Sequence, residues 1–173
     1  MSVYKKYVSQ ALQIYDDALR LLERGDIFDA VEKAWSAIEN ARKALLIAVG
    51  VPEQKAGSVE FGVGFFIRIL RKLGRKDIVE KYYGFDYCLH IKGFYELQMP
   101  PDLLSEKIYE AEGWISEVLG LIDKLKNVDL KDAIKMMEES IKLKRRILQL
   151  NIEYRQALQQ IDNAISRAVT QKA

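Results

Sequence analysis

The feature that most constrains the fold is a stretch of forty residues, 130–169, that contains neither proline nor glycine. As one helix, at about 1.5 Å per residue, it would form a rod on the order of 60 Å long. Lys144 and Asn151 interrupt its apolar stripe, which consists of Ile134, Met137, Ile141, Leu148, Ile152, Leu158, Ile161 and Ile165. A helix of this length cannot bury its stripe alone. It should pack on a second chain, which we favour, or fold back through a bend near Asn151.

The residues before this stretch predict a bundle of helices joined by short loops. Apolar residues recur at the helical period over residues 3–23 and again over residues 27–49. Between them, Gly25 can adopt the left-handed conformation that ends a helix, and the carboxylate of Asp26 can cap the next one. Because this connection is so short, the two helices should form an antiparallel hairpin.

Further helices are expected up to residue 126. The expected elements are a polar loop over residues 53–57, a helix capped by Ser58 that ends at Gly74, a short turn or helix over residues 77–83, and helices over residues 86–97 and 102–126. The sequence therefore predicts an all-α fold in two parts. An up-down bundle of four or five helices should cover residues 1–126, and a long helix, capped by Asp129, should cover residues 127–173.

Composition excludes several classes of protein. Apolar residues make up 49% of the chain and charged residues 30%, which is enough to bury a core and argues against disorder. The single cysteine, Cys88, rules out an internal disulfide framework. The first residues lack the apolar core of a signal peptide, and the most apolar stretch, residues 61–70, is too short to span a membrane. We expect a cytoplasmic protein without a membrane segment.

The charge distribution is uneven along the chain. Residues 1–130 carry 18 basic and 20 acidic side chains, and residues 131–173 carry 9 and 5. The basic end includes one cluster, formed by Lys142, Lys144, Arg145 and Arg146. On one helix these four spread around the circumference, so a solvated face is favoured over a phosphate-binding patch. Nucleic-acid binding through this cluster would weaken steeply with salt.

Metal and cofactor sites have little support in the sequence. One histidine and one cysteine, two residues apart, cannot supply a zinc site at any usual spacing. The glycines Gly62 and Gly64 resemble the start of a dinucleotide-binding fingerprint, but no strand precedes them and Ile67 occupies the third glycine position. We therefore expect neither a metal ion nor a cofactor.

His90 is the one side chain suited to proton transfer near neutral pH. Asp86 lies one helical turn before it and could orient the ring, although the same pair could equally be a structural hydrogen bond. The residues on either side of His90 are rich in aromatic side chains. These could stack on nucleobases, but their helical spacing favours a place in the core. They are Tyr82, Tyr83, Phe85, Tyr87, Phe94 and Tyr95.

Three stretches carry a resemblance to a known family. Residues 18–26 read ALRLLERGD, residues 30–45 read AVEKAWSAIENARKAL, and residues 89–96 read LHIKGFYE. Together they resemble the archaeal PaREP1 group within the HEPN superfamily, over about residues 11–122. The resemblance implies a helical bundle that forms a homodimer. Many HEPN proteins are ribonucleases or toxins paired with a nucleotidyltransferase antitoxin, and others are non-catalytic binding modules.

The sequence departs from the nuclease motif of this superfamily at one position. Active HEPN ribonucleases carry an arginine a few residues ahead of the histidine, and here the corresponding positions are Phe85, Gly84 and Tyr83. Without that arginine, the negative charge that develops on the phosphate has no evident stabilising group.

Two functions follow from the resemblance. The favoured one is a non-catalytic, dimeric HEPN-like binding protein, with a protein partner such as a nucleotidyltransferase, or with RNA or a nucleotide as ligand. The alternative is a metal-independent RNA endonuclease that uses His90. Its assisting groups would be Lys92 and Tyr95 from the same segment, or Glu39 and Lys43 from the helix over residues 27–49.

Overall fold

A computed structural model describes residues 2–170, and the side chains of residues 2–161. Every regular element in this part of the chain is helical, which confirms the all-α prediction. The chain divides into two units, Met1–Ile134 and Lys135–Ala173. The division therefore falls inside the last helix, α7 (Lys131–Thr170). That residues 1–126 form a domain of their own stays a prediction.

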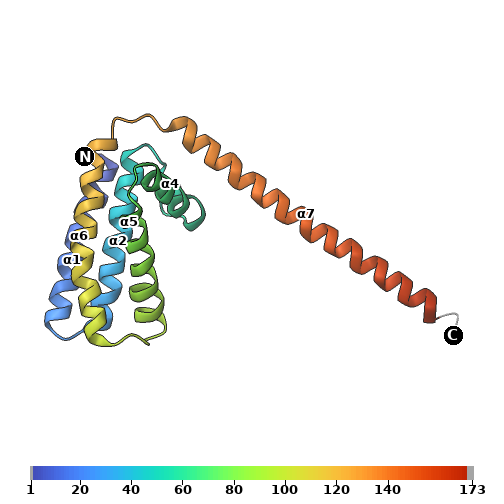
Figure 1. Cartoon of the computed structure of the whole chain (residues 1–173), viewed down its shortest axis with the longest axis horizontal. Helices are drawn as coiled ribbons and strands as arrows, with labels where there is room; N and C mark the ends of the chain where they lie inside the picture. Colours follow the sequence, from blue (N-terminus) through green and yellow to red (C-terminus); the bar gives the residue numbers. More distant parts are fainter. Residues whose placement is uncertain (1, 171–173) are drawn as a thin grey trace. The chain divides into compact units, whose positions relative to one another are not determined.

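The first unit is built on four helical rods that run alternately up and down (Figure 1). The rods are α1 (Val3–Glu23), α2 (Ile27–Ala48), α5 (Lys76–Phe85) continued by the π-helix η2 (Asp86–Tyr95), and α6 (Pro101–Leu125). Helix α2 contacts α1, α6 and η2, so it lies at the centre of the unit. Its central position explains why it is apolar around most of its circumference, with ten buried residues.

The connection between α1 and α2 ends the first helix as predicted. Gly25 has a φ angle of +79°, and the N–H of Asp26 donates to the carbonyl of Leu21 at 3.0 Å. These are the features of a helix closed by a left-handed glycine. The predicted cap on α2 is wrong, because the side chain of Asp26 makes no capping hydrogen bond.

A short insert lies between α2 and α5. It consists of α3 (Glu53–Ala56), the π-helix η1 (Val59–Val63) and α4 (Gly64–Lys72). The prediction of a polar loop over residues 53–57 is wrong, because the carbonyl of Pro52 accepts the N–H groups of Lys55 and Ala56 and starts a helical turn. The predicted cap at Ser58 is confirmed, since its hydroxyl accepts the N–H of Phe61 at 3.2 Å.

An aromatic core joins the insert to α5 and α6. Trp114 is fully buried, donates its indole N–H to the carbonyl of Ile78 at 2.9 Å, and contacts the rings of Phe66, Tyr82 and Phe85. Tyr82 and Phe85 thus belong to the core, as their helical spacing favoured. Three further aromatic residues of that segment are exposed: Tyr83, Tyr87 and Tyr95.

In its described residues the second unit consists of one helix, α7, without a second element on which to bury apolar side chains. Residues 136–161 include many exposed apolar residues, among them Leu143, Leu148 and Leu158. Ile134, which heads the predicted stripe, is buried in the first unit, and Ile165 lies outside the residues whose side chains are described. None of the described helices has a run of apolar residues long enough to cross a bilayer.

Replacing Gly62 by alanine should destabilise the first unit. An added Cβ would lie 2.3 Å from the carbonyl oxygen of Ala56 and 2.8 Å from the Nη1 atom of Arg42. Overpacking of this kind costs about 1–3 kcal/mol, and a backbone oxygen cannot move aside easily.

Gly120→Ala is the matched control, because its Cβ would meet nothing within 4 Å. In the interior of α6 it should stabilise by up to about 1 kcal/mol. Denaturant unfolding of both variants measures the difference, and equal effects would contradict the close contact at Gly62.

Candidate functional site

The segment that carries His90 is a π-helix rather than the ordinary helix that the sequence predicts. In η2 the backbone hydrogen bonds join residue i+5 to residue i, as between the N–H of Glu96 and the carbonyl of Ile91 at 3.0 Å. This wider turn brings side chains five residues apart to neighbouring positions. His90 and Tyr95, which would point in different directions on an α-helix, therefore meet with ring centroids 4.9 Å apart.

Gly93 allows η2 to approach its neighbours closely. A Cβ at this position would lie 2.6 Å from the carbonyl oxygen of Cys88, 2.8 Å from Leu104 of α6 and 3.2 Å from Val31 of α2. Only a residue without a side chain fits this space. The glycine therefore fixes the distance at which the side chains of η2 face those of α2.

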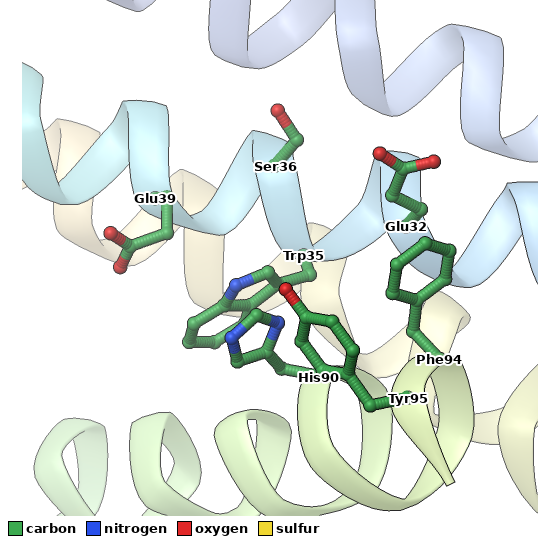
Figure 2. A pocket seen from close by; sticks show the side chains of 7 residues that line it. All are labelled: Glu32, Trp35, Ser36, Glu39, His90, Phe94 and Tyr95. Atoms are coloured by element: carbon green, nitrogen blue, oxygen red, sulfur yellow. The ribbon is translucent and has the colours of Figure 1, made fainter. Parts of the chain in front are cut away.

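A pocket of about 240 Å³ lies between α2 and η2. Figure 2 shows its lining residues, with one group projecting from α2 and the other from η2, and with the rings of His90 and Tyr95 gathered over Trp35. The lining consists of Glu32, Trp35, Ser36 and Glu39 from α2 and His90, Phe94 and Tyr95 from η2.

Aromatic contacts hold the imidazole of His90 on two sides. The ring stacks on Trp35 with centroids 5.0 Å apart and an angle of 20° between the planes, and the edge of Tyr95 meets it at 73°. Tyr95 in turn contacts Phe94 at 5.3 Å. The stack covers one face of the imidazole and fixes its orientation by packing rather than by a carboxylate.

The buried Arg42 forms an ion pair with Glu39 within α2 and also joins this helix to the insert. The guanidinium of Arg42 is fully buried and donates two hydrogen bonds to Glu39, at 2.9 and 2.7 Å. Its third hydrogen bond goes to the carbonyl of Ala56 in α3, at 3.0 Å. The hydroxyl of Tyr82 donates to the same carboxylate of Glu39 at 2.9 Å. Arg42 is thus fully engaged inside the protein and does not reach the pocket.

This network determines the charge of Glu39. Burial would raise the pKa of its carboxyl group, but the hydrogen bonds and charge of Arg42 outweigh burial and lower the pKa, with smaller help from Tyr82 and Lys43. Burial, followed by the negative charge of Glu39, also raises the pKa of the Tyr82 hydroxyl. Glu39 is therefore an anion at neutral pH and Tyr82 a neutral donor.

The structure brings only some of the predicted site residues together. His90, Tyr95 and Glu39 line the pocket, and Lys43 lies close enough to Glu39 to affect its pKa. Asp86 interacts electrostatically with two of these residues, His90 and Glu39. Burial raises the pKa of its carboxyl group, the charge of His90 lowers it and that of Glu39 raises it.

Other predicted residues lie elsewhere. Lys92 pairs with Glu96, and also donates to Gln98 at 3.2 Å, so it is not part of the pocket lining. The basic cluster belongs to α7 in the second unit, where all four side chains are exposed: Lys142, Lys144, Arg145 and Arg146. Within the described residues, no group of three or more His, Cys, Asp or Glu side chains is placed to hold a metal ion.

Sequence reasoning missed Trp35, Glu32, Ser36 and the buried Arg42. Trp35 is half-buried and stacks against His90 in the pocket. A signal for Arg42 was present, because an arginine three residues after Glu39 lies on an otherwise apolar face of α2. Charged residues on such a face are buried only when they are paired.

Arg42→Met should lower the free energy of unfolding by on the order of 3 kcal/mol at pH 7, because it leaves the carboxylate of Glu39 without its main partner. The loss should shrink in acid. In the wild type the lowered pKa of Glu39 contributes stability above its ordinary value of 4.5, and this contribution disappears as pH falls through the folded value. In the variant the unpaired carboxyl group binds a proton instead. Urea unfolding between pH 4 and 7 measures the difference.

Lys43→Met is the matched control for this experiment, since it removes a neighbouring positive charge that is only a minor influence on Glu39. Its effect should stay within about 0.5 kcal/mol. A loss for Arg42→Met that is independent of pH would contradict the assigned charge of Glu39.

Comparison with known proteins gives one match. The model of the archaeal PaREP1/PaREP8 family matches residues 6–115, which include most of α1, all of α2, the insert, α5 and η2, and the first part of α6. Searches of curated proteins and of solved structures gave no match. The matched region contains every lining residue of the pocket. The chain belongs to the archaeal PaREP1/PaREP8 family.

Proposed function

We propose that this protein is a non-catalytic, HEPN-like binding protein that acts as a homodimer. The observation that carries the proposal is the charge of the pocket, whose lining contains two carboxylates, Glu32 and Glu39, and neither lysine nor arginine. The HEPN assignment and the dimer come from the resemblance in residues 18–45 and 89–96, and a nucleotidyltransferase is the protein partner that this resemblance implies.

The charge of the pocket opposes RNA cleavage. A phosphodiester carries a negative charge in the ground state, and more negative charge develops on its oxygens as the bond breaks. Glu32 and Glu39 line the same pocket as His90, and their negative charge would repel both, although less at Glu39, which pairs with Arg42. A pocket with aromatic walls and carboxylates at its rim suits a neutral or positively charged group, because both the π faces and the carboxylates attract cations.

Arg42, which pairs with Glu39, cannot bind a phosphate in the pocket. Arg42 is fully buried, and its hydrogen bonds go to Glu39 and to the carbonyl of Ala56. Turning it toward the pocket would break a buried ion pair, which costs several kcal/mol. The pocket lining therefore contains no lysine or arginine that could pair with a phosphate.

One observation favours the alternative, a metal-independent RNA endonuclease. His90 and the hydroxyl-bearing Tyr95 lie at the same pocket, with ring centroids 4.9 Å apart, and both can transfer protons. The alternative would need a cationic group from a second chain to stabilise the phosphate, and it remains a separate prediction with its own test.

Cleavage of labelled single-stranded RNA in the presence of EDTA separates the two functions. We expect the wild type and His90→Ala to degrade RNA at the same background rate, within about twofold, because no group in the pocket stabilises the transition state. Circular dichroism should show that both proteins are folded. Cleavage by the wild type that is at least ten times faster than by His90→Ala, a difference of about 1.4 kcal/mol, would establish the nuclease and overturn the proposal.

A further inference from the structure

A second stripe of residues on α7 has a more regular spacing than the one that begins at Ile134. It begins two residues after Ile134 and continues at alternating intervals of four and three residues. Its members are all exposed: Met136, Ser140, Leu143, Ile147, Leu150, Tyr154, Ala157 and Ile161. We call these eight residues the α7 seam.

The spacing of the seam is that of a coiled coil. Intervals of four and three average 3.5 residues per turn, and a helix that keeps this repeat presents one continuous face to a supercoiled partner. The a positions then include Ile147 and Ile161, and the d positions include Leu143 and Leu150. In parallel coiled coils, isoleucine at a and leucine at d favours two strands, and in an antiparallel pair each isoleucine at a packs against a d residue of the second helix.

Charges beside the seam indicate which partner fits. The g positions carry Glu139, Arg146 and Glu153, so their charge alternates at intervals of seven residues. When two copies of α7 run antiparallel, the g flank of one faces the g flank of the other. With Ile147 opposite Leu150 of the second copy, Arg146 lies beside Glu153 of the second copy, and symmetry makes this pair twice.

Shifting the two helices by one heptad loses this complementarity. One shift brings Arg146 beside Arg146 of the second copy, and Glu139 beside Glu153 of the second copy. The opposite shift brings Glu153 beside Glu153 of the second copy. Like charges at these positions are destabilising, so the g residues select a single antiparallel register.

The parallel orientation uses the same seam less well. There each g residue faces an e residue of the second copy. Glu139 would meet Lys144, but Arg146 would meet the uncharged Asn151 and Glu153 would lie against the apolar Leu158. The antiparallel arrangement gives every one of these g residues a polar neighbour, because Glu139 then lies beside Gln160.

We propose that α7 pairs with α7 of a second copy of this chain as an antiparallel coiled coil, with Ile147 facing Leu150. The pairing deepens the homodimer of the proposed function by naming the surface that forms it. It can fail while that dimer stands, because the resemblance that implies the dimer covers about residues 11–122 and does not include α7. It is also independent of RNA cleavage.

Two aspartate substitutions on α7 test the seam. Ile147→Asp should raise the dissociation constant of the dimer at least about 100-fold, because it places an unpaired charge in the buried seam. Ile152→Asp is the matched control. Ile147 is 50% exposed and Ile152 is 51% exposed, but Ile152 lies on the side of the helix away from the seam, and its effect should stay within about threefold. Sedimentation equilibrium measures both constants, and circular dichroism checks the helix content.

The outcomes separate this proposal from the homodimer in general. A dimer that Ile147→Asp leaves intact would overturn the seam and leave the first unit as the interface. Equal dissociation by both variants would also overturn it. A wild-type chain that is monomeric at micromolar concentration would overturn both the seam and the dimer of the proposed function.

Orientation has its own test. Arg146→Glu should weaken the dimer at least tenfold and the double variant Arg146→Glu, Glu153→Arg should restore it, whereas a parallel pair would not respond in this way. Spin labels on Lys135→Cys in a Cys88→Ser background should lie on the order of 40 Å apart along an antiparallel pair. Helices in a parallel pair are about 8–10 Å apart, so labels within roughly 20 Å of each other would overturn the antiparallel arrangement.

Discussion

The first unit depends on the buried ion pair between Arg42 and Glu39. A guanidinium without access to water must find its partners inside the protein, and Arg42 finds them on two elements, the carboxylate of Glu39 in α2 and the carbonyl of Ala56 in α3. The insert therefore has to fold against α2, and η1 has to place Gly62 where no Cβ fits. Tyr82 adds α5 to the same network. One charged residue thus fixes the positions of three elements, α3, η1 and α5, against α2.

The pocket follows from this arrangement together with the π-helical turn of η2. The network holds Glu39 as an anion at one end of the pocket, and Tyr82, which donates to Glu39, also contacts the ring of Trp35 at 5.7 Å. The position of Trp35 decides where His90 stacks, and the wide turn of η2 adds Tyr95 to the stack. The charge and the aromatic wall of the pocket therefore have a common origin in the core, which explains why a residue that never reaches the pocket controls its chemistry.

Sequence reasoning predicted the helices whose ends carry local signals. The bounds of α1 were correct because Gly25 ends it, and those of α2 were correct to within one residue. The π-helices were missed, since a hydrogen bond from residue i+5 leaves no local pattern, and only the tertiary contact at Gly93 accounts for the close approach of η2. On α7 the periodicity was ambiguous between two stripes. Apolar residues of both stripes are exposed, Leu148 and Ile152 as well as Leu143 and Ile147, so the regular spacing of the α7 seam, and not its exposure, distinguishes it.

The two units of the chain differ in where their side chains find partners. All the groups that set the charge of the pocket belong to residues 32–95, so its chemistry is complete within the first unit. Helix α7 supplies none of them. Isolated helices are marginal in water, and a forty-residue helix with apolar residues on its surface is stabilised chiefly by what packs against it. A second copy of the same helix satisfies this requirement without any contribution from the pocket, and the alternating charges at Glu139, Arg146 and Glu153 give that pairing a direction as well as a surface.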